Sequence, residues 1–283
     1  MADREKLLLP VLRPRVHGGG RYVYLVRARR SGGLSLGINL DPQKSCNFDC
    51  VYCEVLDRRR PGKETGRPPI AAPDVAGELK AALLDLGRGT PLDAADPLRD
   101  ICYAGDGEPS TFAGFLPLAR ALFDARDAAG FSDVPFVLIT NGSGLDRAEM
   151  REAHDLFAAR GGRYWIKLDA GTEEGYRAVC RTAVPFERVL ANLTDAARRH
   201  PVVVQSMFFR RDGAAPAPAE IAAWARRLRD VRDAGGRVAG VQVYTVARET
   251  MEPGLLPLTP GELSGIAARL RRDVPEFPAT IYP

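Results

Sequence analysis

The sequence has no long hydrophobic run. Apolar residues make up 45% of its 283 positions, but no stretch approaches the roughly 18 consecutive apolar residues that a membrane-spanning helix needs. Near the N-terminus, the short apolar run of residues 7–9 is ended by Pro10, so it is typical of neither a signal peptide nor a membrane anchor. We therefore expect a cytoplasmic protein that does not associate with a membrane.

A charge of one sign and an internal repeat are also missing. The formal net charge is only +4, which is too small to indicate a nucleic-acid-binding protein. No self-similarity occurs at the periods of solenoid or propeller proteins. A chain of 283 residues therefore suits one large α/β domain or two small ones.

Cysteine and histidine are scarce, with five and three residues. Three of the five cysteines stand together as Cys46, Cys50 and Cys53, in the spacing C-x3-C-x2-C. This pattern fits a metal site in a reducing compartment better than a disulfide framework. Cys102 and Cys180 each stand alone and are interpreted as packing residues.

Three thiolates on one loop can hold three irons of a [4Fe-4S] cluster and leave the fourth iron open for chemistry. Other interpretations stay open on the residues alone. A structural zinc site needs four ligands, usually in two closely spaced pairs, and no second pair is present. A thioredoxin-like redox site would use Cys50 and Cys53 but leaves Cys46 unexplained. Buried, inert thiols are the third alternative.

Short β-rich runs alternate with longer helical runs along the chain, which indicates parallel strands joined by right-handed crossovers. Strands are predicted at 34–41, 101–104, 136–140, 164–169, 202–208 and 241–246. Helices are predicted at 74–87, 115–129, 146–159, 173–198, 217–234 and 260–272. We interpret 1–33 as an N-terminal basic extension, 34–272 as the core and 273–283 as a C-terminal tail.

Several predicted strands carry apolar residues on one face and mixed, polar residues on the other. A parallel sheet covered on both faces should instead read as continuous apolar residues. We therefore predict an α/β fold in which a curved sheet has helices outside and a functional cavity inside, as in an open barrel. The alternative is a strand face that simply meets solvent.

The cysteine loop resembles the radical SAM superfamily, whose motif is C-x3-C-x-aromatic-C after the first strand of a partial (β/α)6 TIM-like barrel. Tyr52 supplies the aromatic residue, and the resemblance implies that it belongs to the cofactor-binding residues. The resemblance implies that S-adenosyl-L-methionine (SAM) binds the open iron of the [4Fe-4S] cluster. It also implies that an electron from the cluster cleaves SAM to methionine and a 5′-deoxyadenosyl radical, which takes a hydrogen from the substrate. The protein's part is to position these groups.

Other segments strengthen this resemblance. Residues 104–111, with Gly105, Gly107 and Glu108, resemble the glycine-rich loop that contacts the SAM amino group in that family. Glycines let backbone approach a ligand, and the carboxylate of Glu108 suits an ammonium group. Thr140 and Asn141, which are followed by Gly142, resemble a turn at the barrel mouth in family members, although Asn-Gly is also a common turn.

A finer resemblance covers residues 27–271 and points to the iron–sulfur oxidoreductase branch that includes the wyosine-base synthases of tRNA. Archaeal wyosine synthases have cysteines of a second cluster before the motif, whereas no cysteine precedes Cys46 here. We therefore carry over the fold and the radical chemistry and leave the substrate open. A small molecule, a peptide and an RNA base are the candidates, and a wyosine-type synthase is an alternative function.

Reactive groups of such barrels sit at the carboxyl ends of the parallel strands. On that basis Lys167 and Asp169 are the candidate catalytic residues, although a structural ion pair between them is an alternative. Gln205, Ser206 and Tyr244 are candidate SAM contacts. The basic segment 57–73 is a candidate contact for an anionic substrate or an ordinary solvated loop.

The cluster needs an outside electron, so a flavodoxin or ferredoxin partner is expected, while the sequence assigns no oligomeric state. A different class of function is a non-enzymatic iron–sulfur protein for electron transfer, which would need a fourth protein ligand and would not respond to SAM.

Overall fold

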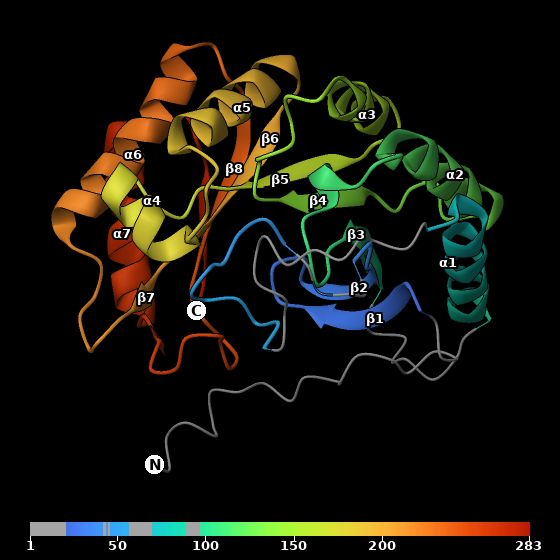
Figure 1. The fold of residues 1–283 in the computed structure, drawn as a ribbon, viewed down its shortest axis with the longest axis horizontal. Coiled ribbons are helices and arrows are strands. Elements are labelled where there is room, and N and C mark those ends of the chain that lie inside the picture. The colour runs from blue at the N-terminus through green and yellow to red at the C-terminus, as the bar shows by residue number, and fades with distance from the viewer. Residues whose placement is uncertain (1–20, 42–43, 45, 57–69, 89–96) are drawn as a thin grey trace.

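A curved, mostly parallel sheet of eight strands forms the framework of the protein (Figure 1). The computed structural model describes residues 21–41, 44, 46–56, 70–88 and 97–283. The strand order is β1-β2-β3-β4-β5-β6-β8-β10, and only β1 runs antiparallel to its neighbour. These strands are β1 (Val23–Ala28), β2 (Gly33–Ile38), β3 (Leu98–Tyr103), β4 (Phe136–Thr140), β5 (Arg163–Lys167), β6 (Val202–Met207), β8 (Val238–Tyr244) and β10 (Ala279–Tyr282).

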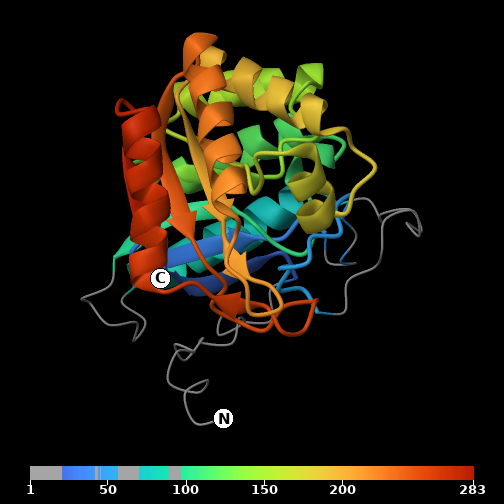
Figure 2. The same cartoon turned by 90° about the vertical axis from the view of Figure 1, so that its left-hand side faces the viewer.

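Helices cover the outer side of the curve and leave the inner side free of helices in the described part of the chain (Figure 1). They are α1 (Ala72–Gly87), α2 (Phe115–Ala128), α3 (Ala148–Ala159), α4 (Glu173–Cys180), α5 (Phe186–Arg199), α6 (Pro218–Asp233) and α7 (Pro260–Asp273), with a 3₁₀ turn η1 (Pro109–Thr111). Helix α7 packs on β10, the edge strand of the sheet. Figure 2 shows α7, in red, along one side of the molecule. A small sheet of β7 (Phe209–Arg210) and β9 (Leu256–Pro257) completes the fold. No described helix combines the length and apolar character needed to cross a membrane.

The two faces of the sheet differ as the alternation of residues predicts. Outward side chains such as Leu138, Ile166 and Val204 are fully buried and join the main core under the helices. Inward neighbours such as Ile139 and Val203 are only partly buried. The predicted α/β half-barrel with an accessible inner face is therefore confirmed.

All six predicted strands are present, with ends shifted by up to three residues. Five of the six predicted helices are also present with similar ends, and Gly130 and Gly161 end two of them in the left-handed conformation. The predicted helix 173–198 is wrong, because it is two helices, α4 and α5. Arg181 has a φ of 45° and Pro185 caps α5, so the segment between them leaves the helical conformation.

Two strands lie in segments that the sequence assigned to an extension and a tail. β1 occupies part of 1–33 and pairs with β2 along its whole length, from Val23 opposite Ile38 to Ala28 opposite Gly33. β10 occupies part of 273–283 and pairs in parallel with β8. The assignment of these two strands to regions outside the core is thus wrong, because both extend the sheet. Residues 1–20 lie outside the described chain, as do residues 57–69 of the predicted basic segment.

Candidate functional site

The cysteine loop follows β2 at the carboxyl edge of the sheet and is held by backbone hydrogen bonds on two sides. The N–H groups of Asp49 and Val51 donate to the carbonyls of Cys180 and Val179, each at 3.0 Å. On the other side, the Met251 N–H donates to the Cys53 carbonyl at 2.8 Å. The break between α4 and α5 therefore serves the site, because it places the end of α4 against this loop.

The three thiols of the loop are half-buried and do not converge. Among the described residues no group of three metal-ligating side chains lies close enough to hold a metal ion. The nearby Cys180 thiol and burial raise the pKa of Cys50 well above its usual value. Burial also raises the pKa of Cys53, to about 11.

Glu108 connects the glycine-rich loop to the end of β4. Its carboxylate is 4% exposed and accepts hydrogen bonds from the Ser110 N–H at 2.9 Å, the Thr140 hydroxyl at 2.5 Å and the Asn141 N–H at 2.7 Å. Burial raises the pKa of Glu108, and these three donors partly offset the rise. The predicted residues Glu108, Thr140 and Asn141 are thus brought together. The Glu108 side chain links the glycine-rich loop to the turn after β4.

Position 105 needs a glycine because its backbone lies very close to the Asn39 side chain. A Cβ atom at this position would lie 2.5 Å from Oδ1 of Asn39, at the end of the neighbouring strand β2. The same Oδ1 accepts the Asp41 N–H at 2.9 Å, and the Asn39 amide donates to Asp106 at 2.8 Å. The loop that carries Gly105, Gly107 and Glu108 is therefore packed directly on the carboxyl end of β2.

Asn47, inside the cysteine loop, ties that loop to the turn after β4. Its amide donates to the Ser143 hydroxyl at 2.8 Å, and its carbonyl oxygen accepts the Asn141 amide at 3.0 Å. Its backbone carbonyl accepts the Thr182 hydroxyl at 2.8 Å. The cysteine loop is thereby fixed to the ends of β4 and α4 by a residue to which no sequence pattern assigned a role.

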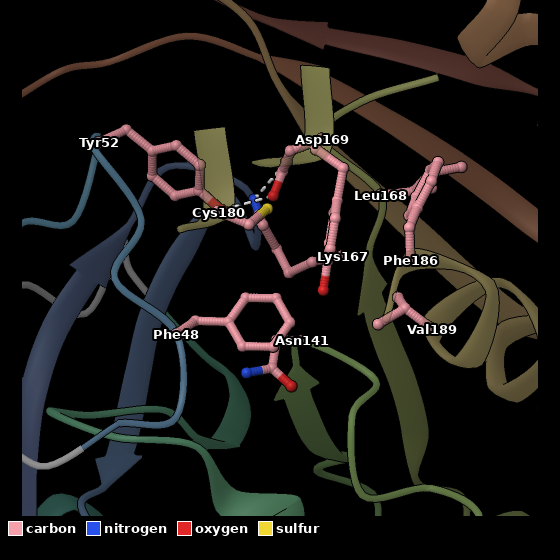
Figure 3. Close-up of a pocket in the computed structure, with 10 residues that line it drawn as sticks. Phe48, Tyr52, Asn141, Lys167, Leu168, Asp169, Cys180, Phe186 and Val189 are labelled. Carbon is pink, nitrogen blue, oxygen red and sulfur yellow. Dashed lines mark hydrogen bonds and ion pairs between the residues drawn. The ribbon is translucent and has the colours of Figure 1, made fainter. Parts of the chain in front are cut away.

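Four side chains from three segments form one polar network at the ends of β5 and β8. Lys167 and Asp169 form an ion pair at 2.9 Å, and the Tyr52 hydroxyl donates to the other oxygen of Asp169 at 2.5 Å (Figure 3). The Lys167 ammonium also donates to the Tyr244 hydroxyl and lies 4.9 Å from the centre of the Tyr52 ring. The structural pairing of Lys167 with Asp169 is therefore present in the fold.

The network favours a charged lysine. Burial alone would lower the pKa of Lys167, but the Asp169 carboxylate and the Tyr244 hydroxyl more than compensate and raise it. For Tyr52, burial and then the Asp169 charge raise the pKa well above its usual value, so the phenol keeps its proton. A protonated lysine holds and orients partners, whereas attack on a carbonyl carbon needs the neutral amine.

A small cavity of about 20 Å³ lies between this network and α5. The rings of Phe48, Tyr52, Tyr176 and Phe186 line it, together with Asn141, Lys167, Leu168, Asp169, Cys180 and Val189 (Figure 3). It is therefore bounded by the cysteine loop, by the predicted catalytic pair and by the end of α4. A cavity of this size holds about one water molecule.

Gln205 and Ser206 point to opposite faces of β6, so only one of them belongs to the inner side. Gln205 lies in register between Lys167 on β5 and Gln242 on β8, and its amide donates to Gln242 at 2.6 Å. The Ser206 hydroxyl is fully buried under α6, where it donates to the Leu168 carbonyl and accepts the Trp224 indole N–H at 2.9 Å. The structure places Ser206 in the outer core, away from the other candidate residues.

The model of the Radical SAM superfamily matches residues 40–216, which is more than half of the chain. The chain belongs to the radical SAM superfamily. The matched range contains the cysteine loop, the glycine-rich loop and the Lys167–Asp169 pair. The resemblance inferred from the motif is thereby confirmed at the level of the family.

Two curated relatives match parts of this radical SAM chain. A protein named GTPase Obg from Brachyspira hyodysenteriae is 29% identical over 168 residues, which cover 59% of this chain and 22% of that protein. A UPF0026 protein of Methanocaldococcus jannaschii is 30% identical over 120 residues, which cover 42% of this chain and 32% of that protein. The matches thus span about a fifth and a third of the length of these relatives.

Solved structures share the fold at low sequence identity. A radical SAM methyltransferase from Sphaerobacter thermophilus has a TM-score of 0.62 and 15% identity, over 97% of this chain and 76% of that one. SuiB of Streptococcus suis bound to S-adenosylmethionine has a TM-score of 0.58 and 11% identity, over 90% and 52%. TYW1 with a lysine-pyruvate adduct has a TM-score of 0.55 and 13% identity, over 92% and 86%.

Membership of the family implies an iron–sulfur cluster and SAM, and the residues at the site can be tested against both. Cysteine thiolates are the usual ligands of such clusters, and three cysteines stand on one loop at the mouth of the half-barrel. The kind of donor therefore fits. The described positions of the thiols do not bring three ligands together around one point.

The sequence missed several residues that build the site. Cys180 looked like a lone packing cysteine, and only the helix break beside Pro185 signals that it reaches the cysteine loop. Arg30 fell in the supposed extension, yet its guanidinium lies 4.4 Å from the centre of the Tyr244 ring. Asn47 carries no motif of its own. Its role arises from contacts with residues about a hundred positions away.

Proposed function

We propose that this protein is a radical SAM enzyme in which Cys46, Cys50 and Cys53 hold a [4Fe-4S] cluster with one open iron. When bound and reduced, such a cluster supplies the electron that cleaves SAM to methionine and a 5′-deoxyadenosyl radical, which takes a hydrogen atom from the substrate. The observation that carries the proposal is the family match over residues 40–216 together with three cysteines on one loop at the barrel mouth.

The chain's own residues would bind, orient and shield. The loops held together by Glu108 and Asn47 form a fixed rim beside the cysteine loop. By the family resemblance, the glycine-rich loop with Gly105 and Gly107 would face the methionine part of SAM. The polar network of Tyr52, Lys167 and Asp169 fixes the opposite wall. A flavodoxin or ferredoxin would supply the electron.

The decisive assay is the formation of 5′-deoxyadenosine. Protein reconstituted without oxygen should hold about four irons per chain and should cleave SAM when dithionite is added. Cys50→Ala should abolish this product, and Cys102→Ala, which alters a buried cysteine on β3 outside the loop, should leave it unchanged. Normal turnover in the Cys50 variant would rule the loop out as the cluster site.

A second candidate function is electron transfer by a cluster with four thiolate ligands. One observation favours it, because Cys180 is held beside the loop by the Asp49 N–H, which donates to its carbonyl at 3.0 Å, and offers a fourth thiol there. A cluster closed by Cys180 would have no open iron for SAM.

Cys180→Ser separates the two candidates. If three cysteines hold the cluster, this variant should keep its iron content and its 5′-deoxyadenosine formation. If Cys180 is the fourth ligand, the variant should lose iron or change its cluster type, and the wild-type protein should not cleave SAM. The same two measurements, iron content and product, therefore decide between an enzyme and an electron carrier.

A wyosine-type synthase is an alternative within the enzymes, supported by the shared fold with TYW1. That TYW1 structure holds an adduct between lysine and pyruvate. Lys167 is the inward-facing lysine of β5 here, but its ion pair with Asp169 and its raised pKa favour the protonated form. We therefore rank this alternative below an unassigned radical SAM activity.

A further inference from the structure

The inner face of the half-barrel contains a positively charged place around Tyr244. The Arg30 guanidinium carbon lies 4.4 Å and the Lys167 nitrogen 4.6 Å from the centre of the Tyr244 ring. Arg29 lies beside them and donates to the Thr245 carbonyl at 2.9 Å. The hairpin between β1 and β2 thus brings two arginines across the open seam of the barrel to the end of β8.

The negative charge near this place is already in use. Asp169 pairs with Lys167 and also accepts the Met207 N–H and the Tyr52 hydroxyl. Asp100 lies on the same face near Cys102, and there its charge and that of Arg30 shift the pKa of Cys102 in opposite directions. The Asp100 carboxylate accepts a hydrogen bond from the Ser35 hydroxyl. Within the described part of the chain, no carboxylate forms an ion pair with Arg30.

Arg30 also has an unused donor. Its Nε atom is buried and has no hydrogen-bond partner among the described residues. Burial and then the nearby Arg30 charge lower the pKa of Arg29, while the charge of Glu54 opposes this effect. A half-buried guanidinium that lies over an aromatic ring, with an unused N–H and no paired carboxylate, has the chemistry of an anion receptor.

Two more buried polar atoms on the inner face are without partners among the residues that the structure describes. The Gln205 side-chain oxygen is an acceptor and the Trp165 indole N–H is a donor, and their residues are 0% and 6% exposed. Gln205 pairs with Gln242, and the Trp165–Val203 pair lies two positions earlier on β5 and β6, so it is the preceding pair on the same face. Buried polar groups are nearly always satisfied in folded proteins, so these atoms point to a polar ligand on the inner face.

We propose that the substrate is a small molecule with an oxyanion, a carboxylate or a phosphate, which Arg30 receives over the Tyr244 ring, and with a second polar group that meets Gln205 and Trp165. The proposed function is needed only to call this molecule a substrate, and the anion site itself does not depend on SAM cleavage. It favours a small metabolite over an RNA base inside the barrel, because one receptor cannot pair with a row of phosphates.

Fluorine NMR of weak probes tests the site directly. Trifluoroacetate carries the anion, and trifluoroacetamide has the same shape without the charge. The anion should bind reversibly and at least about tenfold more tightly than the amide, as a charged hydrogen bond implies. Competition by acetate or by inorganic phosphate then tells which oxyanion is preferred. Equal binding of the anion and the amide would overturn the proposal.

Variants locate the binding. Arg30→Gln should weaken trifluoroacetate binding by at least about tenfold. Arg163→Gln removes the same charge from an exposed position at the start of β5 and should change it by less than about twofold. If the Gln variant fails to fold, Arg30→Met makes the same test, because it keeps an apolar stem over the Tyr244 ring. Unchanged binding in a folded Arg30 variant would contradict the proposal.

S-adenosylhomocysteine serves as the last control, since it has the amino-acid carboxylate of SAM. Trifluoroacetate should stay bound in its presence, because the Arg30 site lies at β8 whereas the Glu108 and Asn141 rim lies at β3 and β4. Displacement by S-adenosylhomocysteine would show that the anion is that of the cofactor and would overturn the assignment to a substrate. All these titrations need no turnover, so a failed SAM cleavage assay leaves their outcome intact.

Discussion

At the scale of single residues, Glu108 illustrates how one side chain can have two roles that must be separated. The sequence suggests a contact with the SAM ammonium, and the structure shows three protein donors on its carboxylate. A carboxylate has about four acceptor positions, so one is left for a ligand. Any loss of SAM binding in a Glu108 variant must therefore be compared with a loss of stability.

Glu108→Gln should lower the free energy of unfolding by about 2 kcal/mol, because the new amide group faces a donor in a buried place. Denaturant unfolding measures this loss. Thr140→Val is the matched control, since it removes one donor from the same carboxylate but keeps the charge. A fall in SAM affinity in the Gln variant alone would assign Glu108 to the cofactor, and an unchanged unfolding energy would contradict its role as a link between the loop and the turn.

His154 gives a prediction about pH. It is 4% exposed and stacks on the Tyr164 ring at 4.1 Å. Burial, helped by the nearby His200, lowers its pKa from 6.5 to about 3. Below pH 6.5 the unfolded chain therefore binds a proton that the folded chain does not, and stability falls as the pH falls towards the folded value.

The free energy of unfolding should thus drop by about 1 kcal/mol per pH unit between about pH 6 and pH 4 through this group. His154→Phe keeps a ring on Tyr164 and should remove this part of the slope. Urea unfolding at several pH values measures the difference between the two proteins. A variant with the same slope as the wild type would show that His154 is protonated in the folded state.

At the scale of elements, close packing of loops on helices decides where glycine is needed. A Cβ atom at Gly171, in the turn after β5, would lie 1.9 Å from the backbone nitrogen of Trp224 in α6. Gly77, inside α1, has open space at the same position. The two glycines look alike in the sequence and differ in the structure.

Gly171→Ala should lower the free energy of unfolding by about 3 kcal/mol, because backbone cannot yield as a flexible side chain can. Gly77→Ala should raise the free energy of unfolding by about 1 kcal/mol, because alanine has a higher helix propensity than glycine at an exposed position inside a helix. Thermal unfolding of both variants checks the pair. A Gly171 variant as stable as the wild type would show that α6 is free to shift away from this turn.

Most strands and helices could be predicted from the sequence, and the same physical reasons explain the elements that were predicted wrongly. The strands β4 and β6 are short apolar runs that neighbouring turns delimit clearly, and the structure confirms them. Helix 173–198 was joined across Pro185 because its apolar periodicity continues on both sides. β1 was missed although its run of aromatic and β-branched residues favours a strand. The basic residues that follow it suggested an extension.

The site was predictable where chemistry is local and unpredictable where it is not. The cysteine loop and the Lys167–Asp169 pair lie within short segments, so spacing alone indicated them. Period-2 alternation allowed only one of Gln205 and Ser206 to face inward, and the choice needed the packing of Trp224. Arg30 and Cys180 join the site through tertiary contacts that no local pattern encodes.

At the scale of the whole molecule, different strands of the sheet carry the two proposed binding sites. β3 and β4 carry the rim of Glu108 and Asn141, whereas β8 and the β1–β2 hairpin carry the positively charged place at Arg30. The cysteine loop lies between them and contacts both α4 and the segment after β8. This arrangement places a proposed cofactor and a proposed substrate anion at different strands of one half-barrel.

The central claim is that an iron of the cluster is left open for SAM. The most direct measurement is the electron paramagnetic resonance spectrum of the reduced, reconstituted protein before and after SAM is added. We predict a cluster signal whose g-values shift when SAM is present, together with a similar shift in Cys180→Ser. A spectrum that does not respond to SAM in either protein would contradict the claim.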